Sequence, residues 1–129
     1  MARRATPRPT DAELAILDVL WRRGPATVRE VTDELSASRA TGYTTALKLL
    51  QIMTEKGLVR RDESQRAHLY HPIVARAETQ RRLVKDLVER AFEGSAMQLV
   101  QRALAARRAS PEELAQIRKL LDEMEQEGP

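Results

Sequence analysis

The sequence contains no cysteine, and several classes of protein are excluded by that absence alone. Disulfide-stapled folds, thiolate metal sites and cysteine nucleophiles all depend on that side chain. Histidine is scarce as well, and the five glycines are scattered instead of gathered in a phosphate-binding loop. His68 and His71 are three apart on a predicted strand, so they point to opposite faces, and no nearby carboxylate pair completes a metal site. We therefore expect no enzymatic activity and no metal or cofactor.

Aromatic residues make up only 3% of the chain, whereas 32% of its residues are charged and Leu, Ala and Val are plentiful. Such a composition favours helices packed through aliphatic side chains and disfavours an all-β fold. No apolar run approaches the roughly 20 residues that a membrane span needs, and none of signal-peptide length follows the basic start of the chain. The expected location is the cytoplasm.

The positive charge is concentrated in the first half of the chain. Residues 1–73 hold 12 Lys and Arg against 9 Asp and Glu, whereas residues 74–129 hold 10 of each. A basic surface is usually just solvated, so charge by itself is weak evidence for nucleic-acid binding. The basic residues gather at Arg3, Arg4 and Arg8, at Arg22 and Arg23 beside Trp21, and at Arg60, Arg61 and Arg66.

Three Ser/Thr-x-x-Glu capping boxes precede apolar periodic runs and predict where three helices begin. The first predicted helix ends near Arg22, before Gly24-Pro25, and the second is about ten residues long. The last helix has Pro111 at its first position, and its apolar residues are spaced like heptad positions a and d. The three boxes are Thr10 with Glu13, Thr27 with Glu30, and Ser110 with Glu113.

A further helix is predicted from about Gly42 to Lys56, with Gly57 as its C-terminal cap. One face carries the apolar stripe Ala46, Leu49, Leu50 and Met53, and the opposite face carries Thr44, Lys48, Gln51 and Glu55, flanked by Thr45. Strands are predicted over residues 58–62 and 67–71, ending before Pro72, and further helices over residues 75–92 and 95–106.

Three helices followed directly by a hairpin are typical of a winged helix-turn-helix. The expected fold is mainly α with a small β-hairpin: a flexible basic arm over residues 1–9, a winged-helix DNA-binding domain over 10–73, and a helical dimerisation region over 74–129.

The predicted DNA interface is centred on the helix that begins near residue 42, because a major groove about 12 Å wide admits one helix. Thr27 lies at a helix N-terminus, which favours a phosphate, and the arginines of the hairpin can hold the neighbouring backbone. For Tyr43, packing on the domain and a hydroxyl contact to a phosphate remain equal alternatives. The predicted DNA-binding residues are Thr27, Arg29, Tyr43, Thr44, Thr45, Lys48, Gln51, Arg60, Arg61 and Arg66.

The apolar residues of the last helices predict a homodimer, because a lone C-terminal region this rich in Leu, Val and Met would expose a large apolar patch. The alternative is a helical adaptor or antitoxin-like module that binds protein through this stripe and nucleic acid nonspecifically. The predicted dimerisation residues are Val84, Leu87, Val88, Leu99, Val100, Leu104, Leu114, Ile117, Leu121 and Met124.

A set of short motifs follows one another at fixed spacings along the chain. These motifs are Thr10-Asp-Ala-Glu13, Trp21, Thr27-Val-Arg-Glu30-Val31, Tyr43-Thr-Thr45, Leu49-Leu50, Glu55-Lys-Gly-Leu58-Val59 and Arg66-Ala-His-Leu-Tyr70-His-Pro72. With them the chain resembles, from about residue 10 to 125, the BlaI/MecI penicillinase repressors and their copper-responsive CopY relatives. The resemblance implies a dimeric repressor that binds an inverted-repeat double-stranded DNA operator, with an upstream sensor or protease as a further partner. Thr44, Thr45 and Lys48 match the DNA-facing positions of that family.

The chain departs from the family pattern at three places. Gln51 and Ile52 stand where members are commonly basic, so the operator sequence is expected to differ. The C-terminal cysteine cluster of CopY-type members is absent, which disfavours direct copper or zinc sensing. Arg102-Ala103 takes the place of the Asn-Phe bond that a membrane sensor protease cuts in penicillinase repressors, so induction by that cleavage is unsupported.

Overall fold

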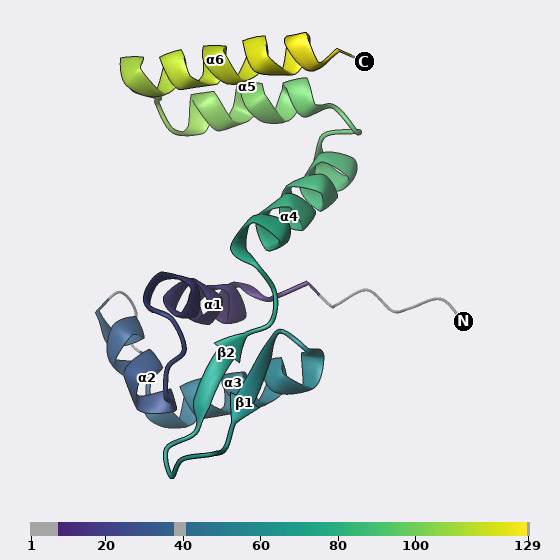
Figure 1. Cartoon of the computed structure of the whole chain (residues 1–129). Coiled ribbons are helices and arrows are strands. Elements are labelled where there is room, and N and C mark those ends of the chain that lie inside the picture. Colours follow the sequence, from purple (N-terminus) through teal and green to yellow (C-terminus); the bar gives the residue numbers. More distant parts are fainter. Residues whose placement is uncertain (1–7, 38–40, 129) are drawn as a thin grey trace. The chain divides into compact units, whose positions relative to one another are not determined.

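The computed structural model describes residues 8–37 and 41–128. The chain forms two compact units that meet in sequence at Leu83 and Val84 (Figure 1), here called unit 1 and unit 2. Arg3 and Arg4 of the predicted basic arm lie outside the described residues.

Unit 1 begins with three helices. The first two begin at their predicted capping boxes, and the third follows Gly42, which makes no side-chain cap. The Thr10 hydroxyl accepts from the Glu13 backbone N–H at 3.2 Å, while Glu13 Oε1 accepts from the Thr10 N–H at 2.8 Å. Thr27 and Glu30 form the same reciprocal pair at 3.2 and 2.9 Å. Each box satisfies two backbone donors that a helix otherwise leaves without a partner. The helices are α1 (Asp11–Arg23), α2 (Val28–Ser36) and α3 (Tyr43–Lys56).

The predicted hairpin is present, but it is shifted along the sequence. Strands β1 (Val59–Asp62) and β2 (Leu69–Pro72) are antiparallel, with Val59 opposite Pro72. Leu58 is not part of β1, because its N–H donates to the Met53 carbonyl at 2.9 Å and caps α3. Residues 67 and 68 belong to the loop, and Pro72 is the last strand residue instead of lying beyond the strand.

A single residue between α1 and α2 pairs with the hairpin, which no sequence pattern predicts. Ala26 pairs with Tyr70 through two hydrogen bonds, with N–O distances of 2.8 and 3.2 Å. This bridge joins the segment before α2 to β2. The hairpin is therefore held to the three helices by backbone hydrogen bonds as well as by side chains.

The hydrophobic core of unit 1 is one cluster of buried apolar residues. It draws on all three helices, the α1–α2 connection, the α3 cap and both strands. Of the predicted α3 stripe, Ala46, Leu50 and Met53 are fully buried and Leu49 is half-buried. The buried apolar residues are Ile16, Leu17, Val19, Leu20, Ala26, Val28, Val31, Leu35, Ala46, Leu50, Met53, Leu58, Val59 and Tyr70.

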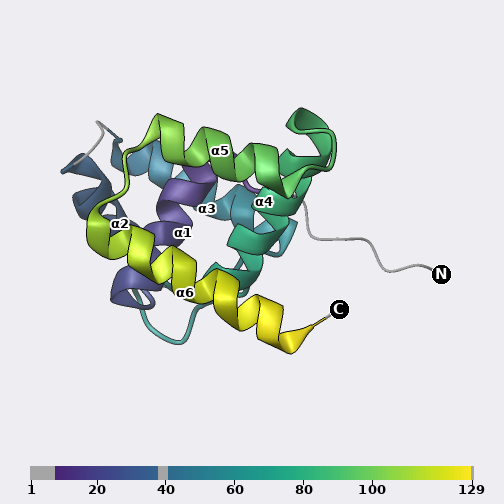
Figure 2. The same ribbon diagram turned by 90° about the horizontal axis from the view of Figure 1, so that it is seen from above.

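Three further helices follow: α4 (Arg76–Ala91), which contains the boundary between the units, α5 (Ala96–Ala106) and α6 (Pro111–Glu127). The Ser95 and Ser110 hydroxyls cap α5 and α6, each accepting a backbone N–H at 3.1 Å. Figures 1 and 2 both show α6 running back in the direction opposite to α5. Neither helix contains a buried residue.

Candidate DNA interface

Helix α3 presents two chemically different faces. Ala46, Leu50 and Met53 are buried in the core, whereas the predicted contact residues Thr44, Thr45, Lys48 and Gln51 are all exposed. Hydroxyl, ammonium and amide groups are therefore displayed along one side of a helix whose other side is fixed. Such groups can donate to and accept from base edges and phosphates.

The C-terminal end of α3 is fixed by a glycine cap and a partly buried ion pair. Gly57 adopts a left-handed conformation, with φ of 82°, that lets the chain turn into β1. Lys56 Nζ contacts both carboxylate oxygens of Glu13, at 2.8 and 2.9 Å, and Glu13 is only 2% exposed. The pair thus joins the end of α3 to the start of α1.

Glu13 is ionised in this site. Burial by itself raises the pKa of its carboxyl, but hydrogen bonds from Lys56 and from the Thr10 N–H, together with the Lys56 charge, outweigh burial and leave the pKa below its ordinary value. The sequence identified Glu13 only as a capping residue. Its helical phase with Ile16, Leu17 and Leu20 was the available signal that it also faces the core.

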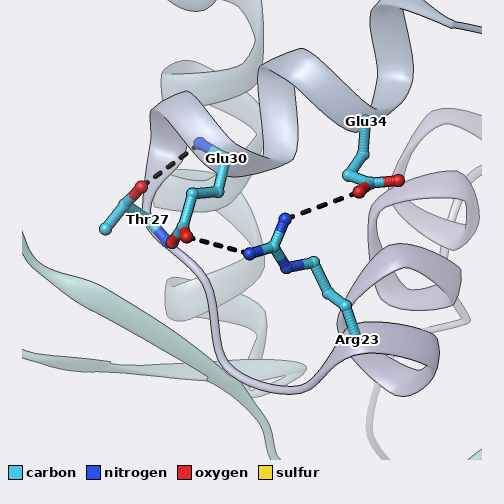
Figure 3. A network of polar contacts seen from close by, with 4 residues as sticks. All are labelled: Arg23, Thr27, Glu30 and Glu34. Carbon is cyan, nitrogen blue, oxygen red and sulfur yellow. Dashed lines mark hydrogen bonds and ion pairs between the residues drawn. The ribbon is translucent and has the colours of Figure 1, made fainter.

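A second polar network fixes α2 against α1. Arg23, the last residue of α1, lies between two acidic residues of α2, 2.8 Å from Glu30 and 3.5 Å from Glu34 (Figure 3). The Thr27 N–H bond to Glu30 lowers the pKa of that carboxyl, and the Arg23 charge lowers it further against the opposing effect of burial. Arg23, which charge counting assigned to a basic cluster, therefore has a structural role.

Four of the predicted contact residues meet in one groove. It has a volume of about 390 Å³ and lies between the start of α2, the start of α3 and the hairpin loop. The Arg29 guanidinium lies 5.8 Å from the centre of the Tyr43 ring, and Tyr43 remains 48% exposed. His68, for which the sequence predicts no metal binding, also lines the groove. Its lining residues are Thr27, Val28, Arg29, Tyr43, Leu47, Arg66, Ala67, His68 and Tyr70.

The structure narrows what Thr27 contributes to this groove. Its hydroxyl accepts from the Glu30 N–H and its own N–H donates to Glu30, so both groups are engaged in the capping box. The backbone N–H groups of Val28 and Arg29, in the first turn of α2, are not part of that box. An anion at this helix end would meet those two groups, and the Thr27 hydroxyl, which only accepts in the capping box, can still donate its proton to it.

The hairpin arginines do not share one face. Arg60 and Arg61 are both exposed, but adjacent strand residues point to opposite sides, and Arg61 lies opposite the buried Tyr70. Arg61 is also 3.4 Å from Glu63. Arg66 lies in the loop and reaches the groove. Among these residues, Arg66 is the best placed beside α3.

The turn of the hairpin is tightened by Asp62, whose carboxylate accepts from the Ser64 N–H at 2.9 Å. That bond is the main cause of a lowered pKa for the Asp62 carboxyl. A fixed turn holds the loop that carries Arg66 in place.

The predicted dimerisation residues lie in α4, α5 and α6, and most remain largely exposed. Met97 and Leu120, which the prediction omitted, are 64% and 54% exposed. Every pair of elements that packs extensively, among the described residues, lies in unit 1. Six of the predicted residues are exposed, namely Val84, Leu87, Val100, Leu104, Leu121 and Met124. The other four are half-buried, namely Val88, Leu99, Leu114 and Ile117.

Residues 8–37 and 41–128 contain neither a cluster of metal ligands nor a membrane-spanning helix. No group of three or more potential metal ligands lies together there. No helix in those ranges has the length and apolarity needed to span a bilayer.

Comparison with known proteins gives a consistent result. The family model for the penicillinase repressor matches residues 9–123. The transcriptional regulator BlaI of Mycobacterium tuberculosis is 36% identical over 118 residues, covering 89% of this chain and 83% of that protein.

The solved structures similar to this chain include two of BlaI. The solution structure of the DNA-binding domain of the repressor BlaI has a TM-score of 0.52 at 25% identity, covering 59% of this chain and 93% of that one. The Bacillus licheniformis BlaI monomer in complex with the blaP half-operator has a TM-score of 0.50 at 26% identity, covering 57% and 90%. The chain therefore belongs to the penicillinase repressor family, the BlaI/MecI transcriptional repressors, and is a DNA-binding regulator and not an enzyme.

Proposed function

We propose that this regulator binds an inverted-repeat operator as a homodimer, with α3 of each protomer in a major groove and the hairpin on the adjacent backbone. The observation that carries the proposal is the polar face of α3. Thr44, Thr45, Lys48 and Gln51 are exposed on a helix whose other side is locked into a closed core. A side chain reads a base only if the element that bears it is held still.

The residues of α3 have different roles in this proposal. Thr44 and Thr45 lie in its first turn, where a recognition helix contacts base edges. Lys48 and Gln51 lie one and two turns later, where an ammonium reaches phosphates or guanine and an amide pairs with adenine. Sequence preference would therefore be carried mainly by Thr45 and Gln51.

Phosphate contacts would come from the groove beside Tyr43. Arg29 and Arg66 bring two guanidinium groups to it, and the first turn of α2 adds backbone N–H donors and a positive dipole end. In this proposal Tyr43, which lines the groove with Arg29 over its ring, offers its hydroxyl to the same phosphate. These contacts would position the protein on DNA without specifying sequence.

The solved relative supports one half-site for each winged domain. That BlaI is described as a monomer in complex with a half-operator, and the similarity covers 57% of this chain. In our proposal residues 10–73 read one half-site, and residues 8 and 9 belong to a basic arm that begins at residue 1.

Dimerisation is assigned to residues 74–129. In the described part of the chain, none of the apolar residues of α4, α5 and α6 is buried, so we propose that a second copy covers them. We propose an upstream sensor as a further partner. The Arg102–Ala103 bond lies inside α5, and a helical peptide bond is a poor protease substrate, so release by cleavage there is not proposed. The proposed site of action is the cytoplasm.

The test is a competition assay with the full chain on duplexes from its own promoter. A dimer that reads a palindrome keeps its preference for one duplex as salt rises, whereas nonspecific binding is lost along the counterion-release slope. Footprinting should then show two protected half-sites related by two-fold symmetry. If no promoter duplex competes better than random DNA, the proposed function is wrong.

A further inference from the structure

The segment that leads from the hairpin into α4 is fastened to α1. The indole N–H of Trp21 donates to the Val74 carbonyl oxygen at 3.0 Å. The guanidinium carbon of Arg76, the first residue of α4, lies 5.7 Å from the centre of the Trp21 ring. Arg76 Nη2 also lies 3.5 Å from Asp18 Oδ1. All four residues belong to unit 1, and none of them lies in the DNA interface described above.

The same segment is held on a second side by backbone. The Ile73 N–H donates to the Leu58 carbonyl oxygen at 2.9 Å, and Leu58 in turn caps α3. Thr79, in the first turns of α4, is only 5% exposed. The start of α4 is thus tied both to α1 and to the end of the proposed recognition helix.

A fixed start matters because α4 is one continuous helix. It runs from Arg76 to Ala91 and contains the boundary between the units. An α-helix is a hydrogen-bonded rod, so a direction set in its first turn is kept in the turns that follow. A freely jointed connection would pass on no direction.

We propose that Trp21, Asp18 and Arg76 are positioning residues for operator recognition, which set the separation of half-sites that the dimer accepts. The inference rests on the proposed function, since it requires two protomers on one operator. Dimeric helix-turn-helix proteins bind half-sites whose spacing mirrors the protein's own geometry. If α4 can leave the winged helix in one direction only, one spacing is favoured, and if it can swivel, several are accepted.

The test measures affinity of the full chain for its operator, for operators with the spacer lengthened or shortened by single base pairs, and for a duplex with one half-site. The variants are Arg76→Ala, which removes an exposed side chain, and Trp21→Phe, which removes the N–H donor but keeps a ring. The matched control is Arg81→Ala, because the ion pair of Arg81 is with Glu78 on its own helix.

The wild type and the control should prefer the native spacing by about tenfold, and the two variants by no more than about threefold, with single half-site affinity within about twofold of wild type. The inference is overturned if Arg76→Ala keeps the full spacing preference, or if its affinity for the single half-site falls just as much. A wild type that accepts all spacings alike also overturns it, while the proposed function stands if operator half-sites still outcompete random DNA. If random DNA binds equally well, the proposed function fails.

Discussion

Units 1 and 2 are built from equally well-signalled helices, yet only unit 1 closes a core. Helices in both units begin at Ser or Thr caps with hydroxyl-to-backbone bonds. In unit 1, Ile16, Leu17 and Leu50 are 0% exposed, whereas in unit 2 Met97 and Met124 are 64% and 59% exposed. Local signals define a helix, but they do not determine what covers its apolar face. Unit 1 finds that cover within the chain, and for unit 2 our proposal assigns it to a second copy.

A charge in the exposed apolar surface of unit 2 should have the greatest effect of the changes proposed here. Leu121→Asp places a charge in the exposed apolar surface of α6 and should convert a dimer to a monomer of 14.6 kDa. Operator affinity should fall by about 100-fold, because the advantage of two linked half-sites is lost. Analytical ultracentrifugation and a binding titration measure the two effects.

The matched control is Gln116→Asp, which adds the same charge at an exposed position of α6 outside the apolar stripe. It should leave mass and affinity unchanged. A Leu121→Asp protein with the wild-type mass would show that unit 2 does not pair through α6.

The next prediction concerns the ion pair between Lys56 and Glu13 in unit 1. Lys56→Ala leaves the Glu13 carboxylate in the core without its cation and should lower the free energy of unfolding by about 2 kcal/mol. Urea denaturation followed by circular dichroism gives this value. Arg22→Ala, which breaks an exposed pair with Asp18, should cost less than about 0.5 kcal/mol. Equal losses in the two variants would mean that burial of Glu13 has no energetic consequence.

The Glu13–Lys56 pair also predicts a pH dependence. Because the folded-state pKa of Glu13 lies below its ordinary value of 4.5, the ionised carboxylate stabilises the fold above pH 4.5, and this contribution is lost as pH falls through the lowered pKa. The stability gap between wild type and Glu13→Gln should therefore shrink below pH 4.5. A gap that is constant from pH 7 down to pH 3 would contradict an ionised Glu13.

Much of unit 1 could be predicted because its information is local. Caps at Thr10, Thr27 and Gly57 fixed the helix ends, since a cap acts within four residues of its helix. The hairpin was predicted, but its strand positions were slightly wrong. Leu58 is not in a strand because its N–H donates to the Met53 carbonyl and caps α3. The confirmed family followed from motifs carried on these same elements.

The contacts that could not be predicted join residues far apart in sequence. Ala26 pairs with Tyr70, and Trp21 donates to Val74, 53 residues away. No local pattern encodes such partners, because they depend on how the helices pack. The groove at Arg29 and Tyr43 is of this kind as well: its residues were predicted singly, and only the fold brings them together.

We propose that the exposed face of α3 reads DNA sequence, and one pair of variants tests this role. Thr45→Ala should lower affinity for the operator by roughly fivefold and leave random DNA nearly unaffected, because it removes a base contact. Arg61→Ala on β1 should weaken both duplexes by a similar, smaller factor, because it removes only charge near the backbone. The measurement is the ratio of operator to random-DNA affinity in each variant. The expected result is a reduced ratio for Thr45→Ala alone. An unchanged ratio in both variants would show that this face of α3 does not read sequence.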